Sequence, residues 1–344
     1  MSGTPRFGLG VPTATEGLMY PIPFADVDED VQLAVAAERL GFDSVWGNDH
    51  VSTQQYIRGA FDEPPRFYDP LTYLAYVAAS TATLRLATCV LVAPFHHPVM
   101  AAKQVATLDQ LSNGRMIVGV GVGAYREEFE AMYPGRDLHR GRYADEFLAA
   151  LDVLFSERRA TYSGEFICFE DIESYPKPVQ SPLPILSGGN SAASRRRAAT
   201  RANGWLPACL TPPEYAAGLN EIRLLEDESD IVADRPFEAA MQLAVSIHDS
   251  HEGAVERFRS SQIQTHLTSL GTSTMKGRLA DSLEMRNLVG TPDDVAEQVQ
   301  AYLESGVEAF AGLLFATNTV AETLEAMEQF SEQVIAPYGR KGRA

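Results

Sequence analysis

The chain has 344 residues, and its 45% of hydrophobic and 22% of charged residues are ordinary values for a folded globular protein, which excludes disordered and fibrous classes. Its 46 acidic residues outnumber its 28 basic residues, and the net charge of −18 would repel a polyphosphate backbone, so no nucleic-acid partner is expected. The sequence has no apolar run near the roughly 18 to 20 residues that span a bilayer and no signal-peptide pattern at its start, so we expect a cytoplasmic protein without a membrane partner.

Apolar runs and amphipathic stretches alternate from one end of the chain to the other. At the first predicted helix, acidic residues 28–30 crowd the start, where the helix dipole favours anions, and Gly41 follows the end. Short β-branched runs predict buried strands. The predicted strands are 6–11, 44–47, 84–92, 115–122, 183–186, 204–208, 237–247 and 309–316. The predicted helices are 29–40, 70–82, 98–111, 141–155, 192–202, 213–225, 293–305 and 320–334.

This alternation of strands and helices predicts an α/β protein with a parallel sheet. Eight successive units favour a closed (β/α)8 TIM barrel over an open doubly wound sheet. No linker divides the sequence, so residues 1–344 are expected to form a single domain. Stretches 125–140 and 249–290 are too long for simple connections, and each follows a predicted strand, so both should emerge at the carboxyl-terminal face of the barrel. We interpret 249–290, an insertion after strand seven, as a lid.

Two polar residues, Asp49 and His50, directly follow the second predicted strand. Strand ends form the mouth of such a barrel, and histidine exchanges protons near neutral pH, so His50 is a candidate catalytic residue. The alternative is that the pair merely caps the end of the strand. The adjacent histidines at 96–97, and the pair His248 and His251, lack the further ligands that a zinc site needs, so no metal site is predicted.

Glycine-rich strand ends provide the other candidates. The run 119–123 is not a dinucleotide-binding fingerprint because residue 124 is alanine, and we interpret it as a surface that a flat ligand can approach closely. The stretch 187–191 precedes a predicted helix, whose amino terminus favours a bound phosphate, although Ser191 could simply cap that helix. Most of the charge at 195–197 is expected to face solvent, and the cysteines are expected to serve packing.

Four stretches carry a family resemblance: LGFDSVWGNDH at 40–50, the segment from HPVMAAK to YREEF at 97–129, the segment from PKPVQ to RANGW at 176–205, and VGTPDDVAEQVQAYLESGV at 289–307. Together they resemble the bacterial-luciferase-like superfamily of flavin- and deazaflavin-dependent oxidoreductases and monooxygenases. This resemblance implies an enzyme with a luciferase-like (β/α)8 barrel and an insertion after strand seven.

The resemblance also assigns roles to individual residues. His50 matches the histidine beside the reactive centre of the cofactor and is the implied catalytic residue, with Asp49 next to it. Cys89 and Val90 match a non-proline cis peptide behind the cofactor ring. Gly188 to Ser191 match the region that holds the cofactor phosphate. The implied cofactor-binding residues are Asp49, Cys89, Val90, Gly123, Ala124, Gly188, Gly189, Asn190 and Ser191.

Two departures from the deazaflavin-dependent sugar-phosphate dehydrogenases are visible. Ala124 stands where those enzymes carry an acidic glutamate, and Gln54 stands where they carry an aromatic residue. A sugar-phosphate substrate is therefore not expected. The polar groups of the substrate pocket must come from elsewhere, with Tyr125, His248 and the insertion left open as sources.

The cofactor is either coenzyme F420 (8-hydroxy-5-deazaflavin) or FMN, and the Asp-His pair favours the deazaflavin. With the deazaflavin, the chain would transfer a hydride to a small organic substrate. With reduced FMN, it would be a luciferase-type monooxygenase supplied by a separate flavin reductase. A third reading is a non-catalytic flavin-binding protein. The resemblance further implies a homodimer, with helices 293–305 and 73–82 as candidate contacts.

Overall fold

The computed structural model describes residues 4–228, 236–279 and 282–341. Eight strands pair in parallel in the order β9-β11-β1-β2-β3-β4-β7-β8, and a pairing of β8 with β9 closes the barrel. This arrangement confirms the (β/α)8 barrel expected from the sequence. The barrel strands are β1 (Arg6–Gly10), β2 (Ser44–Gly47), β3 (Arg85–Val92), β4 (Met116–Gly121), β7 (Ile185–Gly188), β8 (Gly204–Leu206), β9 (Glu238–Ile247) and β11 (Ala309–Phe315).

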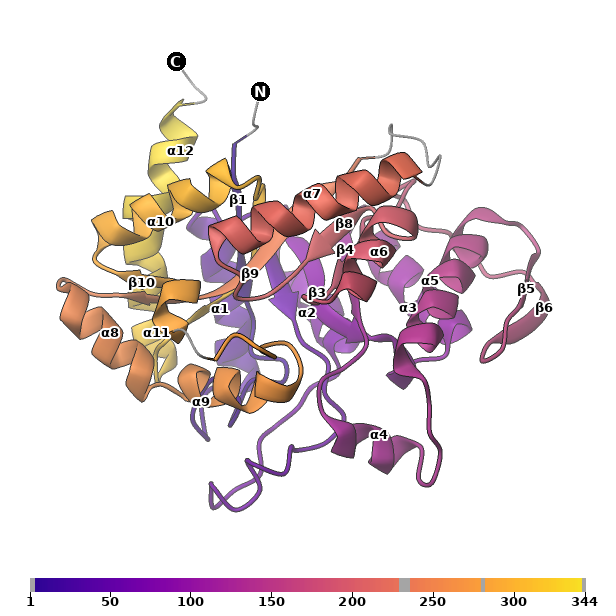
Figure 1. The fold of residues 1–344 in the computed structure, drawn as a ribbon, viewed down its shortest axis with the longest axis horizontal. Coiled ribbons are helices and arrows are strands. Elements are labelled where there is room, and N and C mark those ends of the chain that lie inside the picture. The colour runs from indigo at the N-terminus through magenta and orange to yellow at the C-terminus, as the bar shows by residue number, and fades with distance from the viewer. Residues whose placement is uncertain (1–3, 229–235, 280–281, 342–344) are drawn as a thin grey trace.

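A helix follows each barrel strand, and these helices form the outer layer (Figure 1). The first of them shows how the sequence sets its limits: Asp26 and Glu29 form a reciprocal capping box at its start, and Gly41 adopts a φ of 83° just beyond its end. The layer consists of α1 (Val27–Arg39), α2 (Pro70–Ser80), α3 (Pro98–Leu111), α5 (Arg140–Ser156), α6 (Ala192–Thr200), α7 (Pro212–Glu228), α10 (Pro292–Glu304) and α11 (Val320–Phe330).

The interior of the barrel is filled by side chains from strands all round it rather than left open. Trp46 is buried there against small residues, and a Cβ atom on Gly8 would lie 2.2 Å from its indole nitrogen. Ile117, Leu186 and Leu206 complete this inner cluster. A larger cluster between the barrel and its helices forms the outer core. The closed, packed interior leaves only the strand ends and their loops free to build a site.

Several elements lie outside the eight units. The stretch 125–140, predicted as a long connection, contains a short helix that the sequence did not reveal. The insertion follows β9, the seventh barrel strand, as predicted. Its described residues contain two α-helices, two short 3-10 helices and a short strand, and residues 280 and 281 lie outside the described residues. These additional elements are α4 (Arg126–Met132), β5 (Ala160–Ser163), β6 (Cys168–Ile172), α8 (His251–Ser260), α9 (Gln262–Ser269), β10 (Leu288–Gly290) and α12 (Ala336–Lys341).

The extra segments gather at one end of the barrel. In Figure 1, α4 and α9 lie at the end of the molecule opposite to the two chain termini. Both follow the carboxyl ends of barrel strands, β4 and β9, so they surround the mouth of the barrel. Within the described residues, no helix combines the length and apolarity needed to cross a membrane.

Candidate active site

A cavity of about 570 Å³ opens at the carboxyl-terminal face of the barrel. All ten residues that the sequence proposed for a site lie in its wall, although they come from four separate stretches of the chain. They are Asp49, His50, Cys89, Val90, Gly123, Ala124, Gly188, Gly189, Asn190 and Ser191. The structure thus brings the predicted residues together at one place, while their individual roles stay predictions.

The floor of the cavity is formed by three neighbouring strands. The peptide bond between Cys89 and Val90 on β3 is cis, as the family resemblance predicted, and the register with β4 shifts there. The side chain of Val90 packs between two glycines on β4 and β7. A Cβ atom would lie 2.3 Å from Val90 at Gly121 and 2.6 Å from it at Gly188. Because these two glycines carry no side chain, the floor presents bare backbone on both sides of Val90.

One end of the cavity lies at the amino terminus of α6. Ser191 caps this helix, and its hydroxyl accepts a hydrogen bond from the Ser194 amide at 3.2 Å. Gly189 adopts a φ of 112°, and the Asn190 side chain bonds to the backbone of Ala208 at 2.9 Å and of Thr274 at 3.0 Å. The capping interpretation of Ser191 is therefore correct, and the same helix end still offers the positive end of its dipole to an anion.

Two arginines add positive charge to this end. Of residues 195–197, Arg196 is exposed, Arg195 pairs with Glu221, and only Arg197 lines the cavity. Arg197 is 8% exposed and is held by Asp145 at 2.7 Å, so it is a fixed group rather than part of a solvated face. Arg140 also lines the cavity and donates to the Gly123 carbonyl at 2.9 Å.

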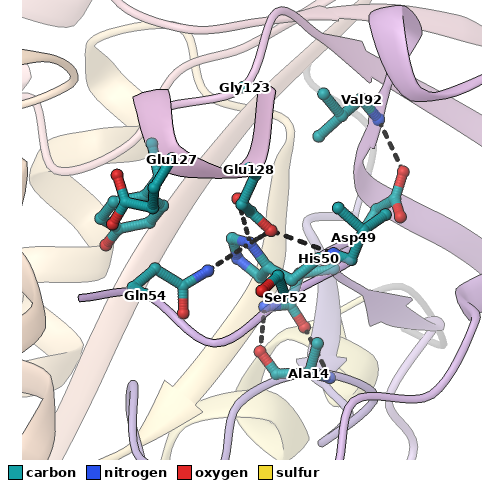
Figure 2. A network of polar contacts seen from close by, with 12 residues as sticks. Ala14, Asp49, His50, Ser52, Gln54, Val92, Gly123, Glu127 and Glu128 are labelled. Carbon is teal, nitrogen blue, oxygen red and sulfur yellow. Dashed lines mark hydrogen bonds and ion pairs between the residues drawn. The ribbon is translucent and has the colours of Figure 1, made fainter. Parts of the chain in front are cut away.

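Asp49 connects the ends of two strands. One of its carboxylate oxygens accepts from the Val92 amide at 2.9 Å (Figure 2). The same oxygen lies 2.8 Å from Nε2 of His96. Asp49 is buried, and His96, which the sequence gave no role, is its partner. These bonds fix the end of β2 against the end of β3 and so fix the backbone from which His50 extends.

His50 is held by a carboxylate from another loop. Nδ1 of His50 lies 3.1 Å from Oε2 of Glu128 in α4, and Glu128 also accepts from the Val51 amide at 3.0 Å (Figure 2). The Gln54 amide lies 3.0 Å from the same imidazole nitrogen. Because the ionised carboxylate can only accept a hydrogen bond, it favours a proton on Nδ1, which leaves Nε2 as the nitrogen available to a ligand. Glu128 is 1% exposed, so this pair is shielded from bulk water.

A second histidine reaches the cavity from the insertion. Nδ1 of His266, in α9, lies 3.1 Å from the Tyr56 hydroxyl and 3.2 Å from the Tyr125 hydroxyl. The Tyr125 hydroxyl also contacts Ser269 at 3.1 Å. Burial and the neighbouring His50 lower the pKa of His266 to about 3, so the ring is neutral at physiological pH. Of the sources of polarity that the sequence left open, Tyr125 and the insertion line the cavity.

The remaining candidates from the sequence lie elsewhere or are inert. His248 lines a separate polar hollow beside Arg257 and Glu322. The part of the chain that the structure describes holds no cluster of metal-ligating side chains. Cys89 and Cys209 line the cavity, but burial raises the pKa of each thiol to about 12, which is consistent with packing rather than with nucleophilic chemistry.

Fold and site together define the class of protein. A barrel whose strand ends present a flat, backbone-lined floor next to a helix amino terminus and two arginines fits a planar cofactor with a phosphate. The sequence profile of the luciferase-like monooxygenase family matches residues 6–309. The chain belongs to this family, as its sequence predicted.

Individual relatives differ in the cofactor that their names state. A Mycobacterium tuberculosis protein of uncharacterised function is 36% identical over 169 residues, which are 48% of this chain and 57% of that relative. The FMNH2-dependent dimethylsulfone monooxygenase of Pseudomonas fluorescens is 28% identical over 331 residues, covering 90% of this chain and 86% of the relative. The F420-dependent glucose-6-phosphate dehydrogenase of Microbacterium testaceum is 27% identical over 300 residues, covering 81% and 85%.

Solved structures support the same fold. The monooxygenase RslO1 from Streptomyces bottropensis superposes with a TM-score of 0.77 at 24% identity, covering 97% of this chain and 99% of that one. At this level of identity the likeness shows the barrel architecture alone.

Proposed function

We propose that this protein is an oxidoreductase that transfers a hydride between a deazaflavin cofactor of the coenzyme F420 type and a small organic substrate. The observation that carries the proposal is the buried pair of His50 and Glu128 in the wall of the cavity. A bound deazaflavin supplies or accepts a hydride but reacts poorly with oxygen. Oxidation of an alcohol releases one hydride and one proton, and the unprotonated Nε2 of His50 would take that proton; in the reverse direction the doubly protonated ring would give it to the carbonyl oxygen.

The chain's own residues would divide the work as follows. Cys89, Val90 and the flanking glycines would support the cofactor ring, and the amino terminus of α6 with Arg140 and Arg197 would hold its phosphate. Glu128 would keep His50 in the tautomer with its proton on Nδ1, so that Nε2 is always the nitrogen that transfers a proton. The insertion would act as a lid, since α9 supplies His266 and apolar side chains to the cavity wall and so limits the access of water.

A second candidate is an FMNH2-dependent monooxygenase, which would need a separate flavin reductase. It is favoured by the 28% identical dimethylsulfone monooxygenase, whose match extends over 90% of this chain. Reduced FMN activates oxygen when bound, and the same anion site and floor would hold it.

Titration of the purified apoprotein with FMN and with coenzyme F420, followed by fluorescence, separates these candidates. We expect micromolar binding of coenzyme F420 and much weaker binding of FMN. A preference for FMN would overturn the deazaflavin proposal and support the monooxygenase. Binding of neither would contradict the anion site at α6, and cofactor binding without turnover of any carbonyl compound would support a non-catalytic flavin-binding protein.

We also propose a homodimer through the α2 and α3 side of the barrel. Tyr76 on α2 and Met100 and Leu111 on α3 are each at least 50% exposed, and the two helices pack against each other. Light scattering should give twice the mass of the chain, whereas the mass of a single chain would contradict this.

A further inference from the structure

The direction of the hydrogen bonds around His266 can be worked out from its neighbours. The Ser269 hydroxyl donates to the His266 carbonyl at 2.7 Å, so its oxygen is left to accept from the Tyr125 hydroxyl at 3.1 Å. The Tyr56 hydroxyl then donates to Nδ1 of His266 at 3.1 Å, because a phenol is the better donor and an imidazole nitrogen the better acceptor. This chain of bonds places the single proton of the neutral ring on Nε2.

Nε2 of His266 is therefore a hydrogen-bond donor. Throughout 4–228, 236–279 and 282–341 no group bonds to this nitrogen. The nitrogen is also not among the fully buried polar atoms that lack a partner, so part of its surface is accessible. The His266 side chain lines the cavity. Its N–H group is thus available to a ligand there.

Apolar side chains line part of the same cavity. Ile263, Leu267 and Leu270, from the same insertion, line the cavity with Met19 and Leu314. The buried arginines of the cavity belong to the α5 and α6 side, where they are held by the Gly123 carbonyl and Asp145. In the insertion itself, Lys276 and Arg278 also line the cavity. Lys276 is exposed, and Arg278 lies 3.6 Å from Glu214, a carboxylate that also pairs with Arg286.

We infer that His266 determines substrate specificity, and that its Nε2–H group binds the oxygen of an uncharged, otherwise apolar carbonyl compound. This inference rests on the proposed function only for the choice of a carbonyl compound as the reacting class. A carboxylate or phosphate would have to give up its hydration against apolar side chains and a neutral ring, which is unfavourable without a paired cation. A neutral carbonyl oxygen loses little and gains the hydrogen bond.

Two probes of similar shape test this inference, cyclohexanone and cyclohexanecarboxylate. Their dissociation constants are measured by ligand-observed NMR on the full chain, with and without bound cofactor. We expect the wild-type protein to bind cyclohexanone at least about tenfold more tightly than the carboxylate, and His266→Phe to weaken cyclohexanone binding by about tenfold. His266→Gln is the matched control, because its side-chain amide keeps an N–H group near the position of Nε2, and it should stay within about threefold of wild type.

Two binding results would contradict the inference. Preference for the carboxylate, or equal binding of cyclohexanone by wild type and His266→Phe, would overturn the inference. Should His266→Phe fail to fold, nitrogen NMR of the wild-type protein with labelled histidine gives a second measurement: a proton on Nε2 supports the inference and a proton on Nδ1 contradicts it. Because neither measurement requires turnover, they separate this inference from the proposed function, which the cofactor titration tests.

Discussion

The two ends of the cavity are built in different ways. The strand-built end comprises Cys89, Val90, Gly121 and Gly188, which belong to strands of the barrel. Gly121 and Gly188 are paired in its ladder with Val92 and Leu206. The loop-built end comprises His50, Glu128, Tyr125 and His266, which follow strand ends or lie in α4 and α9. The comparison teaches that the barrel fixes the platform of the site, whereas contacts between separate loops fix its polar groups.

The largest expected effect concerns the loop-built end. His50→Ala should lower kcat by about 10²- to 10⁴-fold and leave cofactor affinity unchanged, because it removes the proton-transferring group but no part of the floor. Glu128→Gln should lower kcat by about 100-fold, since an amide can hold the wrong tautomer of His50. Steady-state kinetics and cofactor titration measure the two effects separately. A loss of cofactor binding in His50→Ala would mean that the two ends are not independent.

A substitution at the strand-built end should have the reverse pattern. Gly188→Ala places a Cβ atom 2.6 Å from Val90, so it should weaken cofactor binding by about tenfold and lower the free energy of unfolding by about 1–3 kcal/mol. Catalysis at saturating cofactor should change little. The double variant Gly188→Ala/Val90→Ala should recover part of the loss, because it removes the overlapping methyl groups.

Gly339 offers a matched control for this experiment. A Cβ atom there has no neighbour within 4 Å, so Gly339→Ala should leave both cofactor binding and stability near wild type. Equal effects of the two glycine substitutions would contradict the packing of the floor around Val90.

A separate expected effect is on stability as a function of pH. The ring of His266 has a pKa of about 3 in the folded protein and 6.5 as its ordinary value, so between these values the unfolded chain binds a proton that the folded chain does not. Its contribution to stability is present above about pH 6.5 and is lost as the pH falls, by about 1.4 kcal/mol per pH unit. The difference in unfolding free energy between wild type and His266→Gln, from urea titrations, should show this slope. A flat difference would mean that the ring is open to water.

The same contrast explains what the sequence could reveal. The eight barrel strands were predicted to within a few residues, because buried β-branched runs and glycine stops are local signals. The glycines of the strand-built end were predicted with them, since they sit at strand ends, whereas Cys89 and Val90, inside β3, came from the family resemblance. Asp49 and His50 were found for the same reason.

The loop-built end depended on contacts over long distances in the chain. Glu128 is 78 residues from His50, and His266 is 210 residues from Tyr56, so no local pattern joins them. The only local indication that Glu128 has a role was the acidic start of a short helix after the fourth strand. That helix, α4, was itself not predicted. His96 was seen but was considered only as a metal ligand, because its partner Asp49 lies 47 residues earlier.

The insertion leaves and rejoins the barrel at neighbouring points. Gly290, at its end, is the register partner of Ile247, at its start, and its carbonyl accepts a hydrogen bond from the His248 amide at 3.2 Å. A segment whose two ends already touch can be lengthened, shortened or exchanged with little disturbance of strand register. Descendants of an ancestral barrel could therefore acquire new substrates by replacing this one contiguous stretch, and a chimera that carries the insertion of a relative should inherit the relative's substrate preference while keeping its own cofactor.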